Sequence, residues 1–98
     1  MNKEVMDCVL KALAQEVSIV LVTLTHTDGS TPRKAGAKMI VYPDASIIGT
    51  IGGGAFEFQA IKKALEVYNT KQSIHWQCDL EDLGMACGGQ GSVLIEYI

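Results

Sequence analysis

Two glycine-rich stretches, one of them around a cysteine, are the residues of this chain with the clearest capacity for chemistry. Eight of the ten glycines lie within 49–54 and 84–91. Cys87 is followed directly by Gly88 and Gly89, so its thiol has almost no neighbouring side chain to cover it. Glycine is retained where the backbone turns with positive φ or where a ligand approaches the main chain. We therefore expect the two stretches to form one site that binds an anion at one end and a soft atom at the other.

The first stretch suits an anion because three glycines lead directly into an expected helix. Gly52, Gly53 and Gly54 leave the first N–H groups of that helix unpaired, and the helix dipole adds about half a positive charge there. The run is neither GxGxxG nor a Walker loop, so a tight structural turn remains an alternative. Glu57 has two interpretations as well: a carboxylate that caps the helix start, which we favour, or a ligand or general base near Cys87.

A short basic cluster lies in the loop expected at 27–36 and just after it. Arg33, Lys34 and Lys38 place three of the eight basic residues within six positions. A small anion is one partner for such a loop, and a solvated turn is the alternative.

The other cysteines and the histidines carry weaker signals. Cys8 and Cys78 are widely separated and fit structural positions. The sequence contains no CxxC pair, so it does not predict a zinc site. His26 ends an expected strand next to the basic loop, which leaves a cysteine–histidine hydrolase as a weak third option.

Composition limits the class of protein. Hydrophobic residues make up 48% and charged residues 19% of 98 residues, as in a single folded domain. The net charge of −3 argues against nucleic acid as a partner. No apolar run approaches the roughly 18 residues that cross a bilayer, and the N-terminus lacks a secretion signal, so we expect a cytoplasmic protein without a membrane partner.

Hydrophobic periodicity predicts an α/β domain with a mixed five-stranded sheet and two helices. The apolar run 18–25 has the character of a central strand buried on both faces. Strands at 37–42 and 47–51 are expected to form a hairpin. The remaining elements are helices at 4–16 and 55–68 and strands at 73–80 and 91–98. Because so small a core leaves short strands with open edges, we expect a homo-oligomer.

Each expected helix has one apolar face. Val5, Val9 and Leu13 form that of the first, with Met6 and Leu10 beside them. In the second helix the buried face is predicted to contain Phe58, Ile61, Leu65 and Tyr68.

Three ordered motifs resemble one protein family. They are Gly29–Met39, Gly49–Gly54 with Glu57, and Gly84–Gly89, and together they resemble the XdhC/CoxI family. Members are xanthine dehydrogenase accessory factors and relatives from carbon monoxide dehydrogenase gene clusters, associated with binding molybdenum cofactor and passing it to molybdenum hydroxylases. The resemblance implies a cofactor-binding protein that is not an enzyme, with such a hydroxylase and a cysteine desulfurase as partners.

Larger members of the family carry an additional C-terminal domain that resembles a dinucleotide-binding, Rossmann-like fold. We expect residues 1–98 to form one XdhC/CoxI-like domain without it.

The resemblance and the chemistry together define the expected site. Arg33 and the Gly52–Gly54 amides would bind the phosphate or pterin of the cofactor, and the Cys87 thiolate would contact molybdenum or its exchangeable sulfur. The cofactor-binding residues expected are Ser30, Arg33, Lys38, Gly52, Gly53, Gly54, Glu57, Cys87, Gly88 and Gly89. A nucleotide- or pyrophosphate-binding enzyme domain and a structural dimerisation module are the alternatives.

Overall fold

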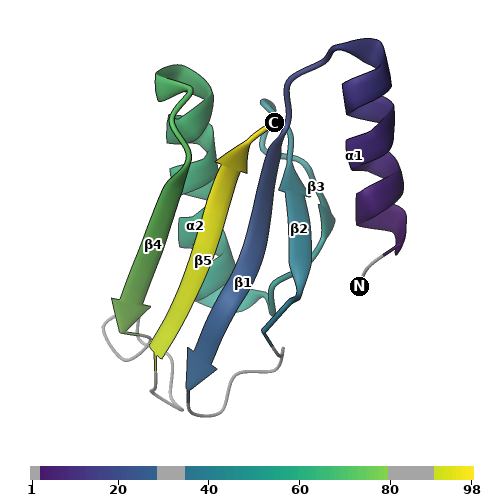
Figure 1. Ribbon diagram of the computed structural model, residues 1–98. Coiled ribbons are helices and arrows are strands. Elements are labelled where there is room, and N and C mark those ends of the chain that lie inside the picture. The colour runs from purple at the N-terminus through teal and green to yellow at the C-terminus, as the bar shows by residue number, and fades with distance from the viewer. Residues whose placement is uncertain (1–2, 29–34, 80–89) are drawn as a thin grey trace.

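The computed structural model describes residues 3–28, 35–79 and 90–98, which form two helices and five strands (Figure 1). The elements are α1 (Lys3–Gln15), β1 (Val20–Asp28), β2 (Lys38–Val41), β3 (Ile47–Gly49), α2 (Gly54–Thr70), β4 (Ile74–Asp79) and β5 (Gln90–Tyr97). The predicted α/β domain with five strands and two helices is confirmed. Within the described ranges, neither helix has the length and apolarity needed to cross a membrane.

The sheet has the strand order β3-β2-β1-β5-β4, and all four pairings are antiparallel. The predicted number of strands is correct, but the prediction that parallel and antiparallel pairs would be mixed is wrong. A crossover helix such as α2 joins strands that run in the same direction, and it makes a mixed sheet only when those strands are neighbours. Here α2 connects β3 and β4, which lie at opposite edges of the sheet.

β1 is the central strand, as predicted. Val20, Leu21 and Val22 are all buried, which explains why this run is apolar without alternation. The strand continues to Asp28, beyond its predicted end at Thr25, because β5 keeps pairing with it as far as Gln90. A register shift between Leu24 and His26 marks a β-bulge in that pairing.

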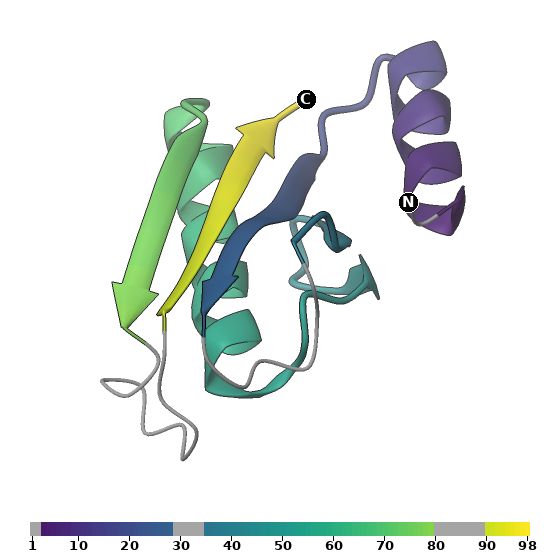
Figure 2. The same ribbon diagram turned by 60° about the horizontal axis from the view of Figure 1, so that its bottom comes forward.

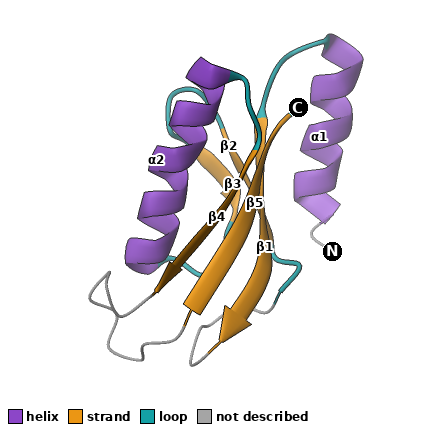
Figure 3. Ribbon diagram, turned by 60° about the vertical axis from the view of Figure 1, so that its left-hand side comes forward, coloured by secondary structure: helices purple, strands orange, loops and turns teal. Residues whose placement is uncertain are grey.

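The two faces of the sheet carry separate apolar clusters, one under each helix (Figure 3). The larger cluster lies under α2 and consists of Val20, Val22, Leu24, Met39, Val41, Ile51, Phe56, Ala60, Ala64, Val67, Val93 and Ile95. The smaller cluster lies under α1 and consists of Val5, Val9, Ala12, Ile19, Leu21 and Ile40.

Each helix buries a face rotated from the predicted one. In α1 the buried residues are Val5, Val9 and Ala12, whereas Leu13 is 58% exposed. In α2 the ring of Phe58 is 58% exposed, with Lys62 Nζ 5.3 Å from its centroid. Each helix touches the sheet along a narrow stripe, so periodicity predicts that a helix is amphipathic but locates its buried face only to within about one residue.

Tyr68 connects α2 to the central strands. Its hydroxyl accepts a hydrogen bond from Val20 N at 3.1 Å and donates one to Val41 O at 2.6 Å. Val20 and Val41 are themselves a pair in the β1–β2 ladder, so one phenol satisfies a donor on one strand and an acceptor on its neighbour. Burial is the largest cause of the raised pKa of Tyr68.

Tyr68→Phe should lower the free energy of unfolding by about 1–3 kcal/mol, because it leaves both backbone groups without their partner. The pKa of Tyr68 is raised above its ordinary value of about 10, so the fold favours the neutral phenol over the phenolate. The stabilisation by the neutral phenol is therefore complete below the pKa of Tyr68 in the unfolded chain and is lost as the pH rises through the folded-state pKa. Urea unfolding of wild type and Tyr68→Phe between neutral pH and about pH 11 measures both effects. Tyr97→Phe is the control, because its hydroxyl contacts Ser18 Oγ at an exposed position; an equal loss in both variants would contradict the assignment.

Candidate functional site

The turn from β3 into α2 follows a path that only glycine adopts readily. Gly52, Gly53 and Gly54 have φ values of 126°, 77° and 68°. Gly53, the N-cap residue of α2, combines φ 77° with ψ −168°, a region that other residues essentially never occupy. A Cβ built on Gly53 would meet no atom within 4 Å, so glycine is required there by backbone conformation and not by crowding.

Glu57 holds this turn together from inside. Its Oε1 accepts hydrogen bonds from the Thr50 hydroxyl, from Ile51 N at 3.1 Å and from Gly53 N at 3.2 Å. Thr50 Oγ1 in turn accepts a hydrogen bond from Gly52 N at 3.0 Å. The favoured interpretation of Glu57 as a carboxylate that caps the helix start is thus confirmed.

This network changes the expected roles of two glycines. The N–H groups of Gly52 and Gly53 were expected to point outward to an anion, but both donate to side chains of the turn itself. The carboxylate also repels an anion placed directly against it. The groups of the junction that suit an anion are the N–H groups of Gly54, Ala55 and Phe56, which have no carbonyl partner one turn earlier in the helix.

Phe56 fixes the helix start against the sheet. The ring is 4% exposed and stacks on Trp76 of β4, with centroids 5.5 Å apart and 18° between the planes. A Cβ built on Gly91 would lie 2.8 Å from Cζ of Phe56. Gly91 belongs to the second glycine-rich stretch, yet its role in the structure is to let this ring pack on β5.

Asp28, Asp79 and Gln90 lie at one end of the sheet, which comes forward in Figure 2. Gln90 pairs with Asp28 on one side and with Asp79 on the other. Gly91, the next residue of β5, lies against Phe56 in the first turn of α2. The predicted site residues Ser30, Arg33, Cys87, Gly88 and Gly89 lie outside the described residues. Among the described residues of this end of the sheet, Gly91 contacts the start of α2 through Phe56.

Lys38 does not join this group. Its Nζ lies 3.3 Å from the hydroxyl of Thr23 and donates a hydrogen bond to it. Strand alternation places both residues on the sheet face that contains Leu21 and Ile40, which is the face covered by α1. Because α2 packs on the opposite face, the sheet separates Lys38 from Gly52–Gly54.

A polar cluster at the β-bulge had no signal in the sequence. The Thr25 hydroxyl lies 2.9 Å from Ser92 Oγ and 3.3 Å from Nε2 of His75, and it donates a hydrogen bond to Ser92 O at 3.1 Å. Ser92 is only 2% exposed, so Thr25 supplies the partner that its hydroxyl needs. The three residues come from three strands, and only the pairing of β1, β5 and β4 brings them together. His26, which the sequence offered only as a weak candidate base for a thiol, follows the bulge and is exposed.

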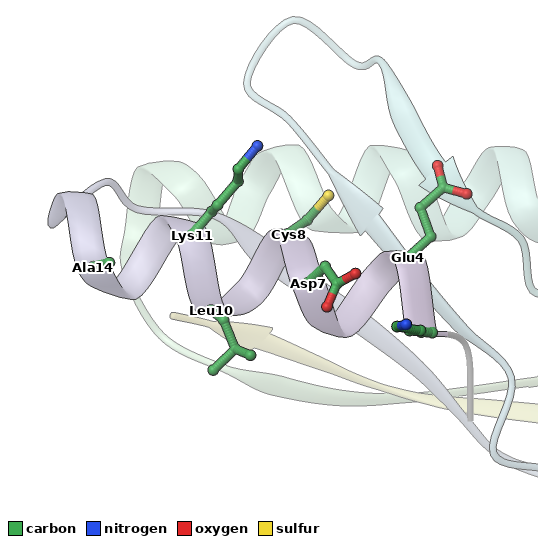
Figure 4. Close-up of a pocket in the computed structure, with 7 residues that line it drawn as sticks. Glu4, Asp7, Cys8, Leu10, Lys11 and Ala14 are labelled. Carbon is green, nitrogen blue, oxygen red and sulfur yellow. The ribbon is translucent and has the colours of Figure 1, made fainter.

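A hollow along α1 is a poor candidate site. Its lining residues all belong to that helix: Lys3, Glu4, Asp7, Cys8, Leu10, Lys11 and Ala14. Figure 4 shows their side chains fanning out around the helix instead of converging on a common point. The best-supported candidate among the described residues is therefore the start of α2, with the adjoining ends of β1, β4 and β5.

The fold and this junction define a small antiparallel α/β domain with a glycine-led helix at one end of the sheet, and comparisons with known proteins agree. The model of the XdhC and CoxI family matches residues 12–78, and the chain belongs to this family. It is 34% identical over 86 residues to an uncharacterised protein, YqeB, of Escherichia coli K12. It also resembles a crystal structure titled as a xanthine dehydrogenase from Bacillus halodurans, with 28% identity and a TM-score of 0.76.

Both relatives are much longer than this chain. The match to the E. coli protein covers 83% of this chain and 16% of that protein. The match to the Bacillus structure covers 94% of this chain and 30% of that one.

Proposed function

We propose that this protein is an accessory factor that binds molybdenum cofactor and helps to insert it into a molybdenum hydroxylase such as xanthine dehydrogenase. Membership of the XdhC and CoxI family supports this role, as does likeness to a Bacillus structure titled as a xanthine dehydrogenase. The cofactor is cargo here, so the protein needs to bind, shield and release it without catalysing a reaction. A cysteine desulfurase is the proposed source of its exchangeable sulfur, and we place the handover in the cytoplasm.

The observation that carries the proposal is the meeting of Asp28, Asp79, Gln90 and the start of α2 at one end of the sheet. Molybdenum cofactor has a phosphate at one end of its pterin and a metal with soft sulfur ligands at the other. The helix N-terminus suits the phosphate, since its N–H groups and dipole favour negative charge.

We propose that residues of segments 29–34 and 80–89 supply the rest of the site. Ser30 and Arg33 would add a hydroxyl and a guanidinium to the phosphate, and Gly88 and Gly89 would allow close approach to the pterin. The Cys87 thiolate would contact molybdenum or its exchangeable sulfur, because soft thiolates suit such metals. In this scheme Gly52, Gly53 and Glu57 shape the turn instead of binding the cargo.

Binding of molybdenum cofactor released anaerobically from a molybdenum enzyme, followed by its absorbance in equilibrium ultrafiltration, tests the proposal. Arg33→Ala should weaken binding by about 10- to 100-fold, since a charge-assisted hydrogen bond contributes about 1.5–3 kcal/mol. Cys87→Ala should also lose the sulfur-loaded form of the cofactor. Lys62→Ala, an exposed change on the outer side of α2, is the matched control and should bind as wild type does.

Two results would contradict the scheme. A Cys87→Ala variant with full affinity and normal sulfur loading would remove Cys87 from it. Adenine nucleotides that raise the melting temperature, while molybdenum cofactor has no effect, would instead favour a nucleotide-binding enzyme domain.

A further inference from the structure

A cavity of about 220 Å³ lies where three parts of the chain meet on the α1 side of the sheet. Lys11 and Gln15 line it from α1, Val17 and Ile19 line it from the connection to β1, and Tyr42 lines it from the end of β2. The hollow along α1 differs, because its lining comes from that helix alone. Sites for drug-sized ligands occupy roughly 300–1,000 Å³, so this cavity suits a small molecule.

The polar groups of the cavity favour an anion. Among the described residues that line it, Lys11 is the only one from the group Lys, Arg, Asp and Glu. Gln15 adds an amide and Tyr42 a hydroxyl, and both can donate hydrogen bonds. Burial is the largest cause of the raised pKa of Tyr42, followed by its side-chain hydrogen bond with Cys8, so the phenol is neutral at physiological pH. The charge of the lining is therefore positive.

Negative groups near the cavity weaken this preference without reversing it. The C-terminus of a helix carries about half a negative charge, but Val17 N and Glu16 N already donate to carbonyls in the last turn of α1, at 2.9 and 3.3 Å. Figure 4 shows Glu4 on the same side of α1 as Lys11, nearer the N-terminus. Neither glutamate lines the cavity, whereas the full charge of Lys11 does.

A thiol and an apolar wall complete the cavity. The Cys8 sulfur lies on the same side of α1 as the Lys11 nitrogen, one turn away (Figure 4), and both residues line the cavity. Ala12 and Ile19 are buried, and together with Val17 they form the apolar wall. An inorganic anion would leave this wall in contact with water, whereas the carbon chain of an organic acid would cover it.

We propose that this cavity binds a small organic carboxylate, with the charged group beside Lys11 and the carbon chain against the apolar wall, next to the Cys8 thiol. Because Lys11 is exposed, its ion pair is weak, and the expected dissociation constant is on the order of millimolar. The inference does not depend on the proposed function, since the cavity and the start of α2 lie on opposite faces of the sheet.

Alkylation of Cys8 gives the first test. Its thiolate attacks the CH₂ carbon of iodoacetate or iodoacetamide, a C–S bond forms and iodide leaves, so the reaction is the same and only one reagent carries a carboxylate. Peptide mass spectrometry measures both rates at Cys8 in the native chain and in the chain unfolded in urea. We expect folding to raise the ratio of the iodoacetate rate to the iodoacetamide rate about threefold or more. An equal ratio in both states would overturn the proposal.

Charge variants and competing ligands test the assigned groups. Lys11→Met removes the charge at similar side-chain length and should return the native ratio to that of the unfolded chain. Lys3→Met, at the other end of α1, is the matched control and should keep the wild-type ratio. Millimolar butyrate should slow the reaction of Cys8 with iodoacetate, whereas inorganic phosphate at equal ionic strength should not. A raised ratio that survives Lys11→Met, or protection by phosphate and not by butyrate, would overturn the proposal.

Discussion

Glu57→Ala should lower the free energy of unfolding by about 3 kcal/mol. The change removes one carboxylate oxygen that accepts hydrogen bonds from the Thr50 hydroxyl and from the N–H groups of Ile51 and Gly53. Hydrogen bonds to a charged group each contribute about 1.5–3 kcal/mol, and partial exposure of this turn reduces their sum. For a domain of this size, that loss should lower the melting temperature by more than about 10 °C.

Two further variants isolate the cause of this loss. Glu57→Gln keeps an oxygen acceptor but removes the charge, so its loss should be smaller, at about 1 kcal/mol. Glu66→Ala removes an exposed carboxylate from the same helix and should change stability by less than about 0.5 kcal/mol. If urea unfolding gave Glu57→Ala and Glu66→Ala the same free energy, the turn would not depend on this carboxylate.

Gly91→Ala should cost about 2–3 kcal/mol and should also move the helix start. The new Cβ would lie 2.8, 3.0 and 3.3 Å from three ring atoms of Phe56. The ring has little room to move, because it is 4% exposed and stacks on Trp76. Overpacking of a filled core costs about 1–3 kcal/mol. A change in Trp76 fluorescence should accompany the loss of stability.

A double-mutant cycle with Phe56→Leu tests the steric cause. Phe56→Leu alone should destabilise the domain by about 1–2 kcal/mol, since it removes part of a buried ring. In the double variant the smaller side chain leaves room for the new methyl group, so its loss should be smaller than the sum of the two single losses by about 1 kcal/mol or more. Additive losses would show that the methyl group does not act through Phe56.

Local interactions were the part of this protein that the sequence predicted well. The helix-capping role of Glu57 was predictable because Glu57 and Gly53 lie within one turn of each other. The central position of β1 followed from its unbroken apolar run, and the β2–β3 hairpin from a short turn between two strands. In all three cases the residues that determine the structure are close in sequence or belong to a single apolar run.

Features that depend on distant partners were not predictable in the same way. The exposure of Leu13 and Phe58 depends on where each helix meets the sheet, and Lys38 lies on the face away from α2 because of strand alternation. Gly91 resembles a ligand-binding glycine in the sequence, and only its contact with Phe56 reveals a packing role. Thr25 and Ser92 meet through a bulge that no local pattern encodes.

The pairing of β1 with β5 has a consequence for synthesis of the protein. This seam joins Val20 to Tyr97, so the middle of the sheet consists of segments from nearly opposite ends of the chain. Until the ribosome has made the eight residues of β5, β1 lacks one neighbouring strand and β4 lacks the one described strand that pairs with it. Contacts so distant in sequence form slowly. The sheet is therefore completed only after β5 has been synthesised, and until then the apolar residues of β1 that it covers are exposed to non-native contacts.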